Sequence, residues 1–149
     1  MAADARVFSL ALPSELRILS VARAFVEAVA QACFLERSTV YAVVTATGEA
    51  VTNIIRHAHR DLPNAQLHIQ LQVLADEVVL TFKDQGEPFD VAQVPYMDPG
   101  ELRIGGRGVF LMRALMDEVA CEPRSPGQRG NTLRLVKRRA RGGQACSAG

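Results

Sequence analysis

The apolar residues of this chain change their spacing near residue 65, and this change sets the class of fold. Before that point they recur every three to four positions, which is the period of an amphipathic helix. From residue 67 to 73 they alternate with polar residues, which is the period of a strand with one buried face. Helical segments kept apart from alternating strands favour an α+β fold, in which helices and a mostly antiparallel sheet form two layers.

A short strand is expected near the start of the chain. Residues 7–12 are apolar apart from Ser9, and Pro13 ends the run. Ser14 is the predicted N-cap of a first helix, which should extend to about Cys33. The chain should therefore leave the strand and enter the helix through a turn.

A second helix is expected to start at Ser38 or Thr39, both of which can cap a helix, and to continue to about Arg60. Gly48 lies in its interior, where glycine costs about 1 kcal/mol relative to alanine. Some neighbouring group should therefore need the space that a side chain would fill.

The rest of the chain adds strands, a long connection and a third helix. The expected elements are strands at 65–73 and 78–83, a helix at 109–116, and a hairpin that pairs 118–122 with 132–137. Residues 84–108 are rich in glycine and proline, and a connection of this length is usually a lid or a binding loop. The order is β-α-α-β-β-lid-α-β-β. We expect one domain over residues 1–137 and a flexible basic tail over 138–149.

Charge and hydropathy disfavour several classes of protein. Seventeen Lys and Arg against sixteen Asp and Glu leave a formal charge of +1, which gives no global field for nucleic acid. No apolar run approaches the roughly 18 residues of a membrane-spanning helix, and the start lacks the pattern of a signal peptide, so a cytoplasmic location is expected. Cys33, Cys121 and Cys146 have neither disulfide nor zinc-site spacing.

Three polar residues lie along one stripe of the second expected helix. Glu49, Asn53 and His57 are spaced four apart, so their side chains share a face. The amide oxygen of Asn53 can ligate Mg²⁺, and the carboxylate of Glu49 can take a proton from an incoming hydroxyl. The alternative is an ordinary solvated face, and a surface or half-buried position is favoured for His57.

Two further motifs lie where strands are expected to end or begin. Asp84 and Gly86 directly follow the strand at 78–83, so Asp84 can accept a hydrogen bond from an exocyclic amine such as that of adenine. Residues 130–132 (Gly-Asn-Thr) open the last strand. Each motif also has the composition of a plain turn.

A glycine-rich segment opens the third expected helix. Residues 105–108 read Gly-Gly-Arg-Gly, and the apolar helix follows them. Free N–H groups and the positive end of a helix dipole can hold phosphate oxygens there. Glycine-rich segments are common at the start of helices, so this motif indicates a phosphate site only in combination with the other motifs.

Taken in order, the four motifs resemble a known family. The segments EAVTNIIRH (49–57), DQG (84–86), GGRGVFLMRALMDEV (105–119) and GNTLRL (130–135) are similar to the N, G1, G2 and G3 boxes of the GHKL ATPase superfamily. More narrowly, they resemble the bacterial anti-sigma factor serine/threonine kinases of partner-switching systems. The resemblance implies the two-layer sandwich of that superfamily over nearly the whole chain.

The resemblance also implies a role for each motif residue. Glu49 would be the general base for a serine hydroxyl, Asn53 would hold Mg²⁺ on the nucleotide phosphates, and Asp84 would read the adenine amino group. Gly86 would shape the pocket, and Thr132 would lie near its adenine end. The implied nucleotide-binding set is Asn53, Asp84, Gly86, Arg103, Gly105, Gly106, Arg107, Gly108 and Thr132.

One position departs from the family pattern, and another leaves a choice. The first glycine motif often reads Asp-x-Gly-x-Gly in the family, and Pro88 occupies the last place here, which implies a stiffer edge of the pocket. The family also places a lid arginine on the γ-phosphate. Arg103 is preferred for this role, because Arg107 lies between two glycines. The alternative for either arginine is a solvated lid charge.

The resemblance implies the partners of a switch kinase. Such a protein would bind a sigma factor or another effector and, with ATP and Mg²⁺, phosphorylate a serine of an anti-sigma factor antagonist, a STAS-domain protein. It would be a homodimer without direct contact to nucleic acid or membrane. The alternative is a GHKL switch module that holds ATP or ADP and regulates a partner by binding alone. The catalytic domain of a sensor histidine kinase is disfavoured, because nothing resembles its dimerising helical hairpin with a phosphoacceptor histidine.

Overall fold

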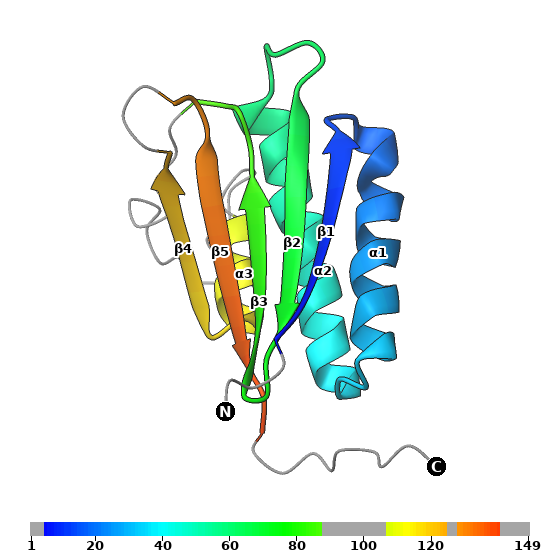
Figure 1. Ribbon diagram of the computed structural model, residues 1–149. Helices are drawn as coiled ribbons and strands as arrows, with labels where there is room; N and C mark the ends of the chain where they lie inside the picture. Colours follow the sequence, from blue (N-terminus) through cyan, green and yellow to red (C-terminus); the bar gives the residue numbers. More distant parts are fainter. Residues whose placement is uncertain (1–4, 88–106, 125–127, 141–149) are drawn as a thin grey trace.

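A five-stranded sheet and a layer of helices form the described part of the protein (Figure 1). The computed structural model describes residues 5–87, 107–124 and 128–140. The strands are β1 (Arg6–Pro13), β2 (Gln66–Val73), β3 (Glu77–Lys83), β4 (Glu118–Pro123) and β5 (Asn131–Arg138). The helices are α1 (Leu19–Ala32), α2 (Arg37–Asn53) and α3 (Arg107–Leu115), with a 3₁₀-turn η1 (Leu16–Ile18) before α1 and a one-turn π-helix η2 (Ile54–Ala58) after α2.

Every strand pairing in the described sheet is antiparallel. The strand order is β1-β2-β3-β5-β4, so β5 pairs with β3, and β4 forms the far edge. All three α-helices lie behind the sheet in Figure 1, and the face toward the viewer carries no helix. The predicted order of strands and helices and the two-layer α+β arrangement are confirmed.

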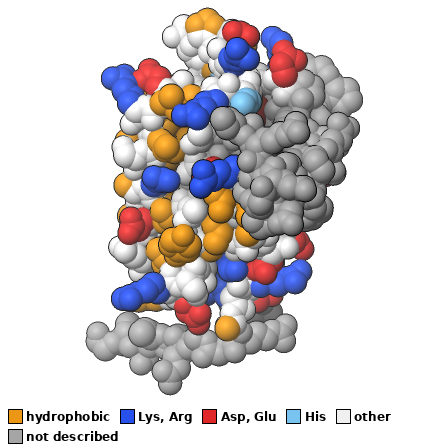
Figure 2. Space-filling view, turned by 180° about the vertical axis from the view of Figure 1, so that it is seen from behind, with side chains coloured by type: hydrophobic (Ala, Val, Ile, Leu, Met, Phe, Trp, Pro, Cys, Tyr) orange, Lys and Arg blue, Asp and Glu red, His pale blue; other side chains and the backbone are white. Residues whose placement is uncertain are grey.

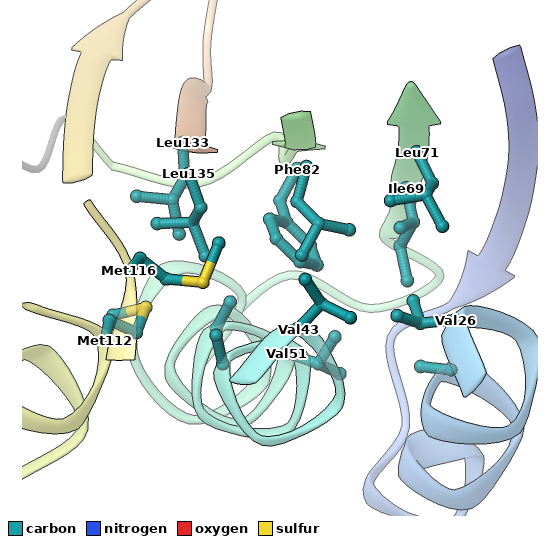
Figure 3. Packing of buried hydrophobic residues seen from close by; sticks show 14 of the residues in the cluster. Val26, Val43, Val51, Ile69, Leu71, Phe82, Met112, Met116, Leu133 and Leu135 are labelled. Carbon is teal, nitrogen blue, oxygen red and sulfur yellow. The ribbon is translucent and has the colours of Figure 1, made fainter. Parts of the chain in front are cut away.

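The core lies between the sheet and the helices, because alternate strand residues point toward the helix layer. Figure 3 shows side chains of β2, β3 and β5 meeting side chains of the helices across this interface. Fully buried residues labelled there are Val26, Val43, Val51, Ile69, Leu71, Phe82, Met112 and Leu135. On β2 the residues between the buried ones are exposed or half-buried, as the sequence alternation predicts.

The serine and threonine that the sequence favours as helix caps do not cap helices. Ser14 precedes η1, and its hydroxyl lies 2.7 Å from Nδ1 of His59 instead of capping the first turn. The helix α2 begins ahead of Ser38 and Thr39, and its N-cap Glu36 makes no side-chain capping hydrogen bond. The predicted caps are therefore wrong, because the hydroxyl of Ser14 has a partner far along the chain.

The second helix does not continue in α geometry to Arg60. After Asn53 the backbone widens into η2, in which the N–H of His59 donates to the carbonyl of Ile54 at 2.8 Å. One extra residue in a helical turn rotates the residues after it by about 100° relative to a regular α-helix. This rotation decides which way Ala58 and His59 face.

The space beside Gly48 is used by an arginine of α1. A Cβ atom on Gly48 would lie 2.7 Å from Nε and 2.8 Å from Nη2 of Arg23. The guanidinium group therefore lies against the bare backbone of α2. This contact accounts for a glycine in the interior of a helix.

The chain stays attached to the sheet beyond the expected start of the tail at residue 138. Arg138 belongs to β5, and its N–H donates to Oδ2 of Asp117 at 2.6 Å. Arg139 donates its backbone N–H to the carbonyl of Asp76 and its Nη1 to the carbonyl of Leu74, each at 2.7 Å. Arg138 and Arg139 are thus part of the folded unit.

Figure 2 shows the face that carries the helices. Blue, red and orange side chains are interspersed on the described part of this face, so charges of both signs stand among apolar groups. None of the described helices is long and apolar enough to cross a membrane.

Candidate functional site

The first cluster of polar groups forms where α2 meets the start of α3. Glu49 and Asn53 lie one turn apart on α2, and Gly108 is the second residue of α3. A Cβ atom on Gly108 would lie 2.9 Å from Nδ2 of Asn53, 3.0 Å from Oε2 of Glu49 and 3.3 Å from Oδ1 of Asn53. The two side chains therefore converge on a point that a glycine leaves open.

The chemistry of this cluster fits a magnesium-bound phosphate group. Within the described residues the side chains of Glu49 and Asn53 make no hydrogen bond, and both residues are half-buried. Carboxylate and amide oxygens are ligands that Mg²⁺ accepts. The first N–H groups of α3 have no partner inside the helix and carry the positive end of its dipole, which suits phosphate oxygens.

The second cluster surrounds the carboxylate of Asp84, which follows β3 and is only 4% exposed. Its Oδ1 accepts the N–H of Gly86 at 2.8 Å and both the backbone and side-chain N–H groups of Asn131 at 3.1 Å. All hydrogen bonds that described residues donate to this carboxylate end on Oδ1. Oδ2 can therefore accept a donor from a ligand, such as an exocyclic amine.

Two glycines allow the backbone to close tightly around Asp84. Gly130 has a φ of 121°, which side chains rarely tolerate, and a Cβ atom on it would overlap the carbonyl oxygen of Asp84. A Cβ atom on Gly86 would overlap the carbonyl oxygen of Ala58 at the end of η2. Residues 84–87 are thus pressed between the start of β5 and the end of η2.

A buried histidine ties this loop to the end of β1. His59 is 5% exposed, its Nε2 accepts the N–H of Gln85 at 2.9 Å, and its Nδ1 lies 2.7 Å from Oγ of Ser14. Burial lowers the pKa of His59 below the ordinary histidine value, and the carboxylate of Asp84 offsets part of this effect. The ring is therefore neutral at neutral pH.

Asn131 and His59 are site residues that the sequence motifs do not single out. Asn131 lies inside the segment 130–135, and strand alternation places it on the same face of β5 as the buried Leu133. This alternation is the sequence feature that could have identified Asn131 as a residue of the site. Thr132, expected near the adenine end, lies on the opposite face by the same rule, and the side chain that meets Asp84 is that of Asn131.

Some predicted residues lie outside the described part of the chain. They are Pro88, Arg103, Gly105 and Gly106. Arg107 is described as the exposed first residue of α3. The predicted lid is therefore described only at its two ends, and the role of a lid arginine stays a prediction. His57 is exposed, and the sequence favours a surface or half-buried position for it.

The π-helix η2 connects the two clusters, because Asn53 directly precedes it and His59 directly follows it. At one end Glu49, Asn53 and Gly108 offer groups for a cation and for phosphate. At the other end Asp84 offers an acceptor for an amine. An adenine nucleotide carries all three of these features.

The sequence matches known proteins along most of its length. Residues 12–137 match the family described as histidine kinase-like ATPase domain. The serine-protein kinase RsbW of Oceanobacillus iheyensis is 32% identical, in an alignment that covers 72% of this chain and 73% of that protein. The serine-protein kinase RsbW of Staphylococcus aureus (strain bovine RF122) is 35% identical, with 62% of this chain and 61% of that protein covered.

Proposed function

Because this chain belongs to the histidine kinase-like ATPase family, we propose that it is a protein serine kinase that uses ATP and Mg²⁺. The convergence of Glu49, Asn53 and the first turn of α3 at Gly108 carries the proposal. It brings a carboxylate beside groups that suit a magnesium-bound phosphate. The names of the two relatives, both serine-protein kinases, support the same activity.

Each residue of the two clusters has a chemical task in this proposal. Glu49 accepts the proton of the serine hydroxyl as that oxygen attacks the γ-phosphorus of ATP, and the bond from this phosphorus to the β–γ bridging oxygen breaks to release ADP. Asn53 ligates Mg²⁺ through its amide oxygen, and the start of α3 donates N–H groups to phosphate oxygens. When bound, Mg²⁺ neutralises charge on the phosphates. Asp84 accepts the adenine amine through Oδ2, while Gly86 and Asn131 hold Oδ1 in place.

We further propose that the kinase acts in a cytoplasmic partner-switching system. In this scheme it binds a sigma factor or another effector, and it phosphorylates a serine of an anti-sigma factor antagonist of the STAS class. A homodimer is the expected assembly. The support for this part is the resemblance of the four motifs to the kinases of partner-switching systems, together with the similarity in sequence to two proteins named serine-protein kinase RsbW.

Phosphate transfer to a candidate antagonist tests the proposal. The full chain is incubated with ATP, Mg²⁺ and a STAS-domain protein, and phosphoserine on the antagonist is measured. Glu49→Gln should abolish transfer but retain nucleotide binding, because a neutral amide cannot take the proton. Glu36→Gln changes an exposed carboxylate without a capping hydrogen bond and should behave as wild type. Full transfer by Glu49→Gln would contradict the role of this base.

A switch that only binds nucleotide is the second candidate. The cluster around Asp84 favours it, because Asp84 is held by Gly86 and Asn131 without any contribution from Glu49. Tight nucleotide binding by the wild-type protein, with no transfer to any antagonist, would support this candidate over the kinase.

A further inference from the structure

The loop after β3 has supports from two different parts of the fold. The N–H of Asp84 donates to the carbonyl of Asn131 at 3.1 Å, and the N–H of Gly86 donates to Oδ1 of Asp84 at 2.8 Å. Between them, the N–H of Gln85 donates to Nε2 of His59 at 2.9 Å. The sheet thus holds the start of the loop, and a side chain from the end of the second helix holds its middle.

The hydrogen bonds of His59 require one neutral form of its ring. A backbone N–H can only donate, so Nε2 must carry a lone pair toward Gln85. The proton of the neutral imidazole then lies on Nδ1, which donates to Oγ of Ser14 at 2.7 Å. Burial lowers the pKa of His59 and so favours this neutral form. The ring joins the end of β1 to the loop after β3 through two directed hydrogen bonds.

The π-helix η2 sets the direction of the ring. The N–H of His59 donates to the carbonyl of Ile54, so the widened turn ends at the histidine. The preceding residue, Ala58, packs against Gly86 so closely that a Cβ atom on the glycine would overlap it. The end of the helix therefore contacts two consecutive loop residues, Gln85 and Gly86.

We propose that His59 is a positioning residue for the adenine site. By accepting the N–H of Gln85, His59 fixes the direction of the Asp84 carboxylate. It thereby sets the preference of the site for adenine over purines without the exocyclic amine. This inference rests on the proposed nucleotide site. His59 acts through the loop and does not touch the ligand. Without its acceptor, the N–H of Gln85 is unpaired and the loop can turn, carrying Asp84 with it.

Substitutions at His59 separate a directed role from a packing role. His59→Phe keeps a ring of similar size and removes both hydrogen bonds. His59→Gln keeps an acceptor at the distance of Nε2, which can reach the N–H of Gln85. His68→Gln, at an exposed position on β2, is the matched control. Affinities of the full chain for ATP and for ITP, with Mg²⁺, are measured by calorimetry, because ITP carries a carbonyl where ATP carries the amine.

The readout is the ratio of the two affinities. We expect wild type and His68→Gln to prefer ATP by at least about tenfold. His59→Phe should reduce this preference about fivefold, and His59→Gln should keep most of it. An unchanged preference in His59→Phe would overturn the inference, and so would an equal loss in both His59 variants. If His59→Phe does not fold, His59→Asn replaces it, because the shorter amide cannot reach Gln85.

Failure of this inference differs from failure of the proposed function. A wild-type protein that binds neither ATP nor ITP has no nucleotide site, and both proposals then fall. A wild-type protein that prefers ATP, with the same ratio in every His59 variant, retains the nucleotide site and reduces His59 to a packing residue.

Discussion

Replacement of Gly108 by alanine tests the point where α2 and α3 meet. The new Cβ atom would lie 2.9 Å from Nδ2 of Asn53 and 3.0 Å from Oε2 of Glu49. Both atoms are ends of side chains, so each can rotate away at a cost of about 1 kcal/mol. Alanine is favoured over glycine in a helix by about 1 kcal/mol, which offsets part of this cost. We expect the free energy of unfolding to stay within about 1 kcal/mol of the wild-type value.

Nucleotide binding should respond more strongly than stability to the same change. The rotation that makes room for the methyl group moves Asn53 and Glu49 away from their common point. The methyl group also stands at the first turn of α3, where N–H groups would meet phosphate oxygens. We expect the affinity for ATP with Mg²⁺ to fall at least about tenfold, which corresponds to about 1.4 kcal/mol. Urea unfolding measures the stability, and calorimetric titration measures the affinity.

Gly48→Ala is the matched control, because it makes the same chemical change on the neighbouring helix α2. The atoms nearest its Cβ would be those of the guanidinium group of Arg23, an exposed and flexible side chain. Binding of ATP should be unchanged in this variant. The reasoning is refuted if Gly108→Ala binds ATP as the wild type does, or if the two variants lose affinity equally.

Three further changes have defined outcomes. Lowering the pH below about 6.5 should reduce the free energy of unfolding, because His59 takes up a proton in the unfolded chain while burial keeps the folded ring neutral. Urea titrations at several pH values measure how the free energy of unfolding changes with pH. This pH dependence should be smaller in His59→Gln. Gly130→Ala should destabilise by more than about 2 kcal/mol, because its φ of 121° and the adjacent carbonyl of Asp84 exclude a side chain; an unchanged thermal midpoint would contradict this. Asp84→Asn should fold normally, because an amide oxygen can accept the same three N–H groups. Its affinity for ATP should fall about a hundredfold, because the amide nitrogen is a donor that would face the donor amine of adenine. Calorimetry measures this loss of affinity.

The features that follow from sequence are those governed by local geometry. The side chains of a strand alternate whatever its partners are, so the burial of Leu67, Ile69 and Leu71 on β2 is predictable. The spacing of Glu49 and Asn53 predicts a shared helix face for the same reason. No local rule relates α3 to α2, so that spacing cannot show that the first turn of α3 lies opposite them.

Partners of hydrogen bonds between distant segments are not predictable in the same way. The hydroxyl of Ser14 suits a helix N-cap, but its partner is His59, 45 residues away in sequence. The hydroxyl of Ser14 could form either hydrogen bond, the N-cap or the one with His59. Which of the two forms depends on where the end of the second helix places His59. A single widened turn leaves the apolar spacing of that helix almost unchanged, so the periodicity predicts a helix without predicting η2.

Because η2 lies between Asn53 and His59, the orientations of these two residues are set by different parts of the second helix. Asn53 lies before the widened turn, so its direction toward Gly108 is set by the regular part of α2. If α geometry continued past Asn53, His59 would be rotated by about 100°, and Nε2 would no longer face Gln85. The extra residue therefore redirects the support of the adenine cluster without moving the phosphate cluster. π-Helices are rare and recur at functional sites. The widened turn of η2 makes possible the two hydrogen bonds of the buried His59 ring. These hydrogen bonds give a physical reason for the presence of η2 at this place in the chain.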